Sequence, residues 1–401
     1  MTAFSDGATA ADRGRAAFLD EVCTTLWPEQ PADAPRTRML LLPGRRRPRL
    51  VVPCEPRAAA AAVRLYGEPR SRHAALATRA LSLVLRSGVG GAVFRDRVEL
   101  PASDQVSSIE TYLRAEVDPD LRISMYLGAP RANRKPVFQL LTRSGEQIGI
   151  AKVAMSPLSR RLVEAEYETL VMLDRADLHG VRAPRVLHYG SWRGMPVLVQ
   201  RPLPIHDRRV ALTPGRLRAA MWDVAMVGYP EPAWSDVADV VGSIGTQLDG
   251  APDSVACTEL RASLDALVRR WGEVRLRVGR WHGDWTPWNM ASTRNGLLLW
   301  DWERSAAGVP VGFDATHYWL QSRVVHRRGE PRRVAGECLA EAPGILTGFV
   351  DDSAAARVTA LLYLAQLAAR SLADGQARSG ARLGDPGWWL LPAIREHVVT
   401  G

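Results

Sequence analysis

Apolar positions recur with two different periods along the chain. In the first 118 residues, short apolar runs predict strands near 39–42, 50–54 and 92–100. Apolar residues spaced three or four apart predict helices near 58–66 and 73–86. The first 15 residues are rich in Ala, Gly, Asp and Thr and predict a disordered tail. Residues 16–118 are therefore expected to form an N-terminal α/β appendage of unknown role, without a catalytic constellation.

A second arrangement runs from residue 119 to the end. Apolar stretches predict strands at 123–127, 137–142, 147–154 and 197–200. A helical pattern covers 158–173, and beyond residue 204 helical patterns dominate, at 214–227, 234–247, 258–271 and 354–374. The predicted fold class is α+β, with a sheet-based segment at 119–203 followed by a mostly helical segment at 204–401.

A hairpin is predicted around Asn295-Gly296. This dipeptide is a strong signal for a two-residue turn in which both positions have positive φ. The resulting register sets Met290 opposite Asp301, so Asn289 and Asp301 are expected to meet at the open end of the hairpin. Because neighbouring strand residues point to opposite faces, at least one of the two must lie beyond the ladder.

The residues at this hairpin carry the candidate chemistry. His282, Asp284 and Asn289 have the spacing H-x-D-x-x-x-x-N, and Asp301 follows twelve residues after Asn289. In kinase-type phosphoryl transfer, the Asp of such a loop accepts the proton of the attacking hydroxyl, while the Asn and a downstream Asp hold metal ions. The spacing predicts Asp284 as catalytic base and Asn289 and Asp301 as Mg²⁺ ligands, with His282 organising the loop. The alternative is that Asp284 only caps a turn.

The sequence HGDWTPWN followed by DWE resembles the aminoglycoside phosphotransferase and choline kinase-like family, over about residues 120–401. Gly283 stands where protein kinases have Arg, and DWE replaces DFG, which points away from a protein substrate. The resemblance implies a bilobal protein-kinase-like fold, with an antiparallel-sheet small lobe at 119–203 and a helical large lobe at 204–401. It also implies ATP and Mg²⁺ as cofactors, and a small-molecule hydroxyl as acceptor: an aminoglycoside-like antibiotic, a sugar or an amino alcohol.

Two lysines stand out against an arginine background. Of 52 basic residues only Lys135 and Lys152 are lysines, and a compact ammonium fits a packed phosphate site that the wider guanidinium does not. Lys152 ends a predicted buried strand, where a kinase places its phosphate-binding lysine. Glu166 lies on the apolar face of the helix at 158–173, with Glu164 and Glu168 rotated away, which makes it the predicted partner of Lys152.

Other positions leave alternatives open. Lys135 lies at the end of a predicted loop at 128–135. It is expected either to contact phosphate or to form part of a solvated basic turn. Asp314 is expected to be structural, as a helix N-cap. Trp285, Trp288 and Trp302 flank the candidate catalytic residues and are expected to pack in the core or cleft more often than to form the wall of an acceptor pocket.

Charge, hydropathy and cysteine spacing limit the kinds of partner and the location that we expect. The formal charge of +9 is spread along the chain, so nucleic acid is not predicted as a partner. No apolar run reaches the length of a membrane span and the N-terminus lacks a signal-peptide core, so we expect no membrane partner and a cytoplasmic location. Four separated cysteines suggest neither a zinc site nor disulfides. Two competing hypotheses are a nucleotide-binding pseudokinase-like protein and, less favoured, a protein kinase.

Overall fold

The N-terminal strands and those that follow residue 119 belong to one antiparallel sheet. The computed structural model describes residues 9–28, 35–65, 72–101, 107–205, 207–229, 231, 233–381 and 383–400. The chain divides into two units, the first made of Met1–Pro130, Arg134–Val163 and Val186–Pro202. Its eight strands lie in the order β3 (Arg97–Pro101), β1 (Arg36–Leu42), β2 (Leu50–Pro53), β4 (Arg122–Tyr126), β5 (Val137–Leu141), β6 (Gln147–Val153), β9 (Met195–Gln200), β8 (Val186–Trp192).

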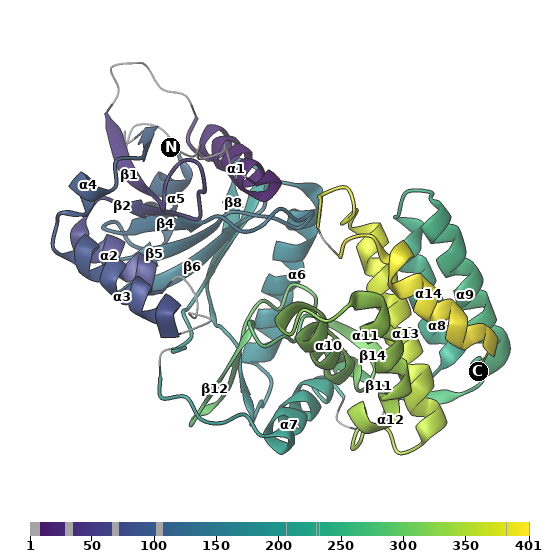
Figure 1. The fold of residues 1–401 in the computed structure, drawn as a ribbon. Coiled ribbons are helices and arrows are strands. Elements are labelled where there is room, and N and C mark those ends of the chain that lie inside the picture. Colours follow the sequence, from purple (N-terminus) through teal and green to yellow (C-terminus); the bar gives the residue numbers. More distant parts are fainter. Residues whose placement is uncertain are drawn as a thin grey trace. The chain divides into compact units, whose positions relative to one another are not determined.

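Helices cover both faces of this sheet (Figure 1). Along β1, Met39 and Leu41 pack in a core with α1 (Ala10–Leu26) and α5 (Ile109–Glu116). The alternate residues Leu40 and Leu42 pack in a second core with α2 (Pro56–Arg64) and α3 (Arg72–Arg86). Strand alternation sends successive side chains to opposite faces, so a strand covered on both sides reads as a continuous apolar run.

Several expectations for the N-terminal part need adjustment. The predicted helices are found as α2 and α3, but the predicted strand at 92–100 is shorter, because Gly90–Val93 forms the short helix α4 and β3 begins at Arg97. Residues 1–8 of the expected tail lie outside the described residues. Residues 10–15 lie in α1, whose N-cap Thr9 accepts a hydrogen bond from the Asp12 backbone.

The second unit consists of Arg131–Asn133, Glu164–Arg185 and Leu203–Gly401, and is mostly helical. The helix α6 (Pro157–Asp174) begins in the first unit and ends in the second. The remaining helices are α7 (Pro214–Ala225), α8 (Val237–Asp249), α9 (Val255–Trp271), α10 (Phe313–Gln321), α11 (Pro331–Ala340), α12 (Ala342–Ile345), α13 (Ser353–Ala373) and α14 (Leu390–Thr400). A short π-helix spans Ser322–His326, and a 3₁₀ helix spans Pro386–Trp388.

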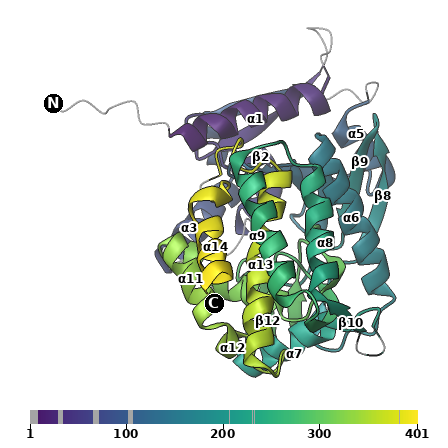
Figure 2. The same cartoon turned by 90° about the vertical axis from the view of Figure 1, so that its right-hand side faces the viewer.

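The helix α13 forms the centre of this unit. It packs against α8, α9 and α14, as Figure 2 shows, and most of its residues are buried. Such burial on all sides follows from its sequence, which is apolar around almost its whole circumference.

The α+β class predicted from the sequence is confirmed. None of the described helices is long and apolar enough to cross a membrane.

Two three-stranded sheets complete the second unit. One has the order β10 (Ala233–Asp236), β11 (Arg275–Trp281), β14 (Ala306–Pro310), and the other β12 (Met290–Thr293), β13 (Gly296–Leu299), β7 (Val181–Arg182). The helix predicted at 234–247 therefore begins later, because residues 233–236 pair with β11 across a long sequence separation. Such pairing overrides a local helical period.

Candidate functional site

The turn after β11 requires a glycine. Gly283 has φ +82°, and a Cβ there would lie 2.1 Å from the backbone oxygen of Arg304. An arginine at this position would carry both the strain of a positive φ and this clash. The Gly283 carbonyl accepts a hydrogen bond from Arg370 Nη1 at 2.6 Å, so α13 fixes the turn from the other side. Asp284 follows directly and is held in a defined place.

Asp314 and His282 hold the same turn through its backbone. The Asp314 carboxylate accepts hydrogen bonds from the N–H groups of His282 and Gly283, at 2.7 and 3.1 Å. His282 Nδ1 accepts from the Asp284 N–H at 3.1 Å, and its Nε2 lies 3.1 Å from the Trp300 carbonyl, which assigns the ring proton to Nε2. Asp314 is structural, but it lies in the first turn of α10, whose N-cap is Gly312.

Burial sets the protonation of both groups that organise the turn. Burial lowers the pKa of His282 to about 4, so the ring is neutral near pH 7 and serves as a structural hydrogen-bonding group. Burial raises the pKa of Asp314 to about 7, against the effect of its two backbone hydrogen bonds. Neither side chain is free to act on a substrate, because each is almost wholly buried and used within the turn.

The Asp284 carboxylate is held at both oxygens. Asn289 Nδ2 donates to Asp284 Oδ2 at 2.9 Å and to the Asp284 carbonyl at 3.0 Å. His317 Nε2 lies 3.1 Å from Asp284 Oδ1, and the Tyr363 hydroxyl lies 2.9 Å from His317 Nδ1. The Asp284 side chain keeps 31% of its surface exposed while His317 keeps 1%. A fixed, partly accessible carboxylate backed by buried groups is an arrangement suited to a general base.

Charge and hydrogen bonding keep this carboxylate ionised. Burial alone would raise the pKa of Asp284, but the hydrogen bond from His317 and the nearby positive charge of Arg370 outweigh it and lower that pKa. Burial lowers the pKa of His317 despite its carboxylate partner, so we take the ring as neutral. Nε2–H then donates to Asp284, and Nδ1 accepts from the Tyr363 hydroxyl.

The hairpin is present, but its predicted register is wrong. Thr293 pairs with Gly296 and Met290 with Leu299, so the turn residues are one position earlier than Asn295-Gly296. Gly296 is already in the strand and has φ +124°. On its other side, β13 pairs in parallel with β7, with Leu297 opposite Val181 and Leu298 opposite Arg182.

Asn289 and Asp301 still lie at the open end of this hairpin. The Trp300 N–H donates to the Asn289 carbonyl at 3.0 Å, which places both residues just beyond the strands. Asp301 has φ +71°, a left-handed conformation that is uncommon for a residue other than glycine. The bend redirects the chain between Trp300 and the buried Trp302. Both residues thus lie at the open end of the hairpin, beyond the ladder, and their shared role as metal ligands stays a prediction.

Three carboxylates gather in the second unit. Oxygen atoms of Glu166, Asp301 and Glu303 all lie within 4.8 Å of one another, and Glu166 and Glu303 are buried. Asn133 Nδ2 donates to Glu303 Oε1 at 2.9 Å. Clustered carboxylates need positive charge nearby to remain ionised, and oxygen ligands are those that Mg²⁺ prefers. The donor set therefore fits a divalent cation.

The helical face predicted for α6 is confirmed. Glu166 is fully buried, whereas Glu168 is exposed and Glu164 is intermediate. Residues two apart on a helix are rotated by about 200°, which explains why only one of the three points inward. The structure adds that Glu166 lies beside Asp301 and Glu303, which the sequence did not indicate. Its pairing with Lys152 stays a prediction.

The two lysines occupy different environments. Lys152 lies in β6, opposite Val137 and Leu198, and is buried to 7% exposure. Lys135 lies in the loop between β4 and β5 and is half-buried. Its neighbour Arg134 donates to the Gly14 carbonyl and stacks on Phe18, so that residue anchors α1. The two readings of Lys135, phosphate contact or basic turn, both stay predictions.

The flanking tryptophans are mainly core residues. Trp285 and Trp302 are fully buried, and Trp302 lies edge-on to the His282 ring with centroids 4.6 Å apart. Trp302 Nε1 donates to the Leu299 carbonyl at 2.9 Å. Trp288 is 36% exposed. The two buried tryptophans thus pack in the core around the loop, which was the favoured expectation.

Sequence reasoning missed four residues that complete the site, namely His317, Tyr363, Arg370 and Glu303. A usable signal existed for His317, which lies three residues after Asp314 and so shares its face of a short helix. Tyr363 lies within the long apolar run of α13, where one hydroxyl gives no pattern.

No family model matches the chain, and no curated protein sequence matches it. Among solved structures, it is similar to an aminoglycoside phosphotransferase in a ternary complex with ADP and hygromycin B (13% identity, 73% of this chain and 99% of that chain covered, TM-score 0.48). It is also similar to an amicoumacin kinase in complex with AMP-PNP and Ca²⁺ (13% identity, 72% and 92% covered, TM-score 0.42). A third is a choline kinase from Streptococcus pneumoniae (13% identity, 66% and 90% covered, TM-score 0.42). These are small-molecule kinases, the group that the sequence resembles; at such identities and TM-scores, residue roles rest on this chain's own geometry.

Proposed function

We propose that this chain is an ATP-dependent phosphotransferase that moves the γ-phosphoryl group of ATP to a hydroxyl of a small molecule. The observation that carries the proposal is the Asp284 carboxylate, held by Asn289 and His317 with a lowered pKa and with its surface partly open. An ionised, oriented carboxylate is what deprotonation of an acceptor hydroxyl requires. The acceptor is an aminoglycoside-like antibiotic, a sugar or an amino alcohol.

Each residue has a distinct role in this proposal. Asp284 orients the acceptor hydroxyl and takes its proton at the carboxylate, and the hydroxyl oxygen forms the new bond to phosphorus as the bond to the β-phosphate oxygen breaks. Asn289 donates with its amide nitrogen, which leaves its amide oxygen for a metal ligand. Bound Mg²⁺ would neutralise phosphate charge. Lys152, fixed by Glu166, and Lys135 are assigned to the nucleotide phosphates.

The carboxylate cluster extends the metal-binding assignment. The sequence predicts Asn289 and Asp301 as metal ligands. Glu303 and Glu166 lie close enough to Asp301 to contribute further oxygen ligands. Mg²⁺ is bound through one or two protein carboxylates and keeps several waters, so not every member of the cluster has to contact it. In this proposal, the carboxylates that do not contact the metal stabilise nearby positive charge, including that of Lys152.

His317 and Tyr363 act as positioning residues. Neither is exposed to a substrate, since both are almost fully buried. The ionised Asp284 carboxylate, which can only accept, fixes the tautomer of His317, and the Tyr363 hydroxyl donates to the other ring nitrogen. His317 in turn fixes the rotamer of Asp284 and favours its ionised form. A reacting group that is already held in the productive geometry lowers the activation free energy, because the entropy of ordering it is not lost during the reaction.

The decisive experiment measures ATP consumption by the purified chain with Mg²⁺ across a panel of aminoglycosides, sugars and amino alcohols. The phosphorylated product is identified by its mass. We expect one acceptor class to give product in wild type and none in Asp284→Asn. ATP binding without transfer to any hydroxyl compound or protein would support the nucleotide-binding pseudokinase-like hypothesis instead.

A further inference from the structure

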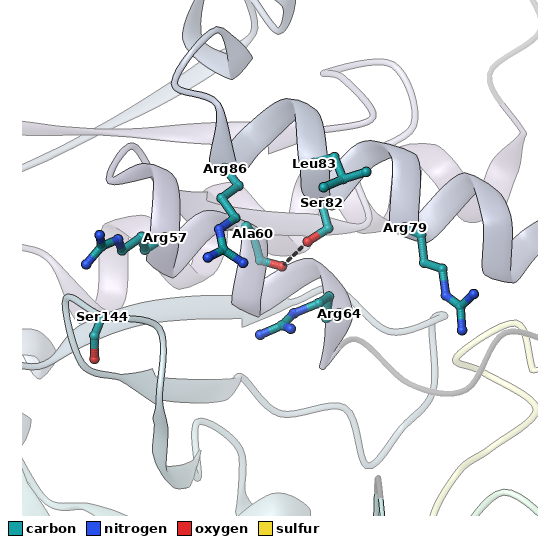
Figure 3. Close-up of a pocket in the computed structure, with 8 residues that line it drawn as sticks. All are labelled: Arg57, Ala60, Arg64, Arg79, Ser82, Leu83, Arg86 and Ser144. Atoms are coloured by element: carbon teal, nitrogen blue, oxygen red, sulfur yellow. Dashed lines mark hydrogen bonds between the residues drawn. The ribbon is translucent and has the colours of Figure 1, made fainter.

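A basic groove lies between α2 and α3 of the first unit, and none of the residues that line it has been assigned a role above. Figure 3 shows its lining, which includes Arg57, Arg64, Arg79, Arg86, Ser82 and Ser144. The hollow has a volume of about 610 Å³, within the usual range of small-molecule sites. Its floor is apolar at Ala60 and its rim carries Leu83, which is 67% exposed.

The arginines come from both helices. Arg57 and Arg64 are seven residues apart on α2, as are Arg79 and Arg86 on α3, so each helix presents both side chains on one face about 10 Å apart. The helices run in opposite directions, and Figure 3 shows the Arg64 side chain pointing away from Arg79, to the side of the groove where Arg57 and Arg86 lie. The groove therefore has three positive charges toward one end and that of Arg79 at the other.

These charges differ from others in the same unit. Arg38, Arg114 and Arg122 pair with Glu99, Glu110 and Glu55, at 3.1, 2.6 and 2.6 Å. Within the described ranges, the four groove arginines form no ion pair, and all four are exposed. The sequences of α2 and α3 contain no Asp or Glu. Four guanidinium groups without a carboxylate create a positive potential that anions can satisfy.

Packing fixes the groove before any ligand binds. Five consecutive alanines, 58–62, are buried, which lets α2 lie close to both α3 and the sheet. The Ser82 hydroxyl donates to the Ala60 carbonyl at 3.0 Å and joins the two helices at mid-groove. Gly145, with φ +89°, brings the turn that carries Ser144 so near that its Cβ would lie 2.7 Å from the Arg57 carbonyl oxygen. A preformed site loses little conformational entropy on binding.

We propose that this groove binds a small molecule carrying two phosphate groups about 10 Å apart, one at Arg57, Arg64 and Arg86 and the other at Arg79. Guanidinium groups bind phosphate oxygens through two parallel hydrogen bonds, which single-point cations do not provide. The concave shape favours a compact ligand over a membrane surface, and the apolar floor accommodates the body that joins the two phosphates. The proposal does not depend on the phosphotransferase assignment, because it uses none of those residues.

The test is calorimetric titration of the full-length chain at low ionic strength, without nucleotide. The probes are fructose 1,6-bisphosphate, with phosphates at opposite ends of a sugar, and glucose 6-phosphate, with one. We expect the bisphosphate to bind at least about tenfold more tightly, since one bidentate pair contributes on the order of 1.4 kcal/mol or more. Arg57→Gln with Arg86→Gln should remove that advantage by disabling one end.

The matched control is Arg46→Gln with Arg95→Gln, which removes two exposed arginine charges of the same unit outside the groove. It should bind the bisphosphate within about twofold of wild type, because screening limits distant charges. Equal affinity for the two probes, no measurable binding of the bisphosphate, or equal losses in the groove and control variants would each overturn the proposal.

A second arm addresses the exposed leucines of α3. Leu76 and Leu83 are 61% and 67% exposed beside the arginines, and a basic face with apolar residues can also contact anionic lipid. Sedimentation with phosphatidylglycerol vesicles is measured for wild type and for Leu76→Gln with Leu83→Gln. Leucine-dependent sedimentation together with unselective phosphate binding would replace the small-molecule ligand by a membrane. Retained bisphosphate selectivity in the leucine variant supports the proposal.

Discussion

The turn around Asp284 and the groove between α2 and α3 hold their charges in opposite ways. In the turn, Asp314, Asp284 and Arg370 are each used in hydrogen bonds to neighbouring groups. In the groove, the arginines are exposed and form no ion pair among the described residues. A charge that is satisfied internally contributes to the fold and to positioning, whereas an unsatisfied surface charge contributes only when a ligand arrives.

The largest expected effect separates chemistry from folding in the turn. Asp284→Asn keeps the shape of the side chain but removes the base, so turnover should fall about 10²–10⁴-fold. Binding of Mg·ATP should remain near wild type, because the carboxylate acts on the acceptor. Steady-state turnover and nucleotide titration of the same preparation measure the two quantities. Turnover within about threefold of wild type would remove Asp284 from the role of base.

The second prediction concerns how tightly the turn is built. Gly283→Ala combines a positive φ with a Cβ 2.1 Å from the Arg304 carbonyl oxygen, so it should destabilise folding by about 3 kcal/mol or more. Gly308→Ala is the matched control, since Gly308 has φ +72° but no atom within 4 Å of its Cβ position. It should cost only about 1–2 kcal/mol. Equal losses in chemical denaturation would mean that the close approach is relieved by a small backbone shift.

A third prediction follows from the buried His282. Its folded pKa of about 4 lies below its usual value of 6.5, so the unfolded chain binds a proton between these values that the folded chain does not. His282 should therefore lower the free energy of unfolding by about 3 kcal/mol as the pH falls from about 6.5 to 4. Asp314, whose folded pKa is raised to about 7, contributes with the opposite sign over the same range, so the contribution of His282 is read from a comparison of two proteins. His282→Gln, which cannot titrate, should lose less stability than wild type on acidification over this range. An unchanged slope would contradict the neutral, buried state of His282.

The sequence was informative where a local period determined the answer. Glu166 was identified on the inward face of α6 because helical spacing alone separates it from Glu164 and Glu168. The placement of Asn289 and Asp301 at one end of a hairpin was predictable because a short turn connects the two strands between them. The hairpin register was not predicted correctly; β13 also pairs with β7, more than a hundred residues upstream of the turn, and the local turn signal carries no information on that pairing.

Residues that act from remote elements were the least predictable. His317 and Tyr363 reach Asp284 only because α10 and α13 pack together, which no local pattern encodes. The same limit applies to β10 and β11, whose pairing is purely tertiary. The arginines of α2 and α3 can each be read from the sequence, but their gathering around one groove depends on the antiparallel packing of the two helices.

The fourth prediction tests the positioning residues. A hydrogen bond to a charged group contributes about 1.5–3 kcal/mol, so His317→Ala should lower kcat roughly 10–100-fold with little change in KM for ATP. His317→Gln, which keeps an N–H donor, should recover part of this loss. Tyr363→Phe removes a bond between neutral groups and should cost about 3–10-fold.

The pH profile distinguishes positioning from a general loss of structure. His317 lowers the pKa of Asp284, so without His317 the acidic limb of kcat should move to higher pH. A fall in kcat without that movement would assign His317 to packing alone.

The smallest expected effect completes the contrast between the two regions. Arg57→Gln with Arg86→Gln should change the free energy of unfolding by no more than about 0.5 kcal/mol, because exposed side chains without ion pairs contribute little to the fold. Arg370→Gln is the comparison in the turn: it removes the charged donor to the Gly283 carbonyl and should cost about 1.5–3 kcal/mol. Urea denaturation of both variants gives the two values directly. Comparable destabilisation would show that the groove arginines stabilise the helix pair, and their lack of carboxylate partners would then no longer indicate a ligand.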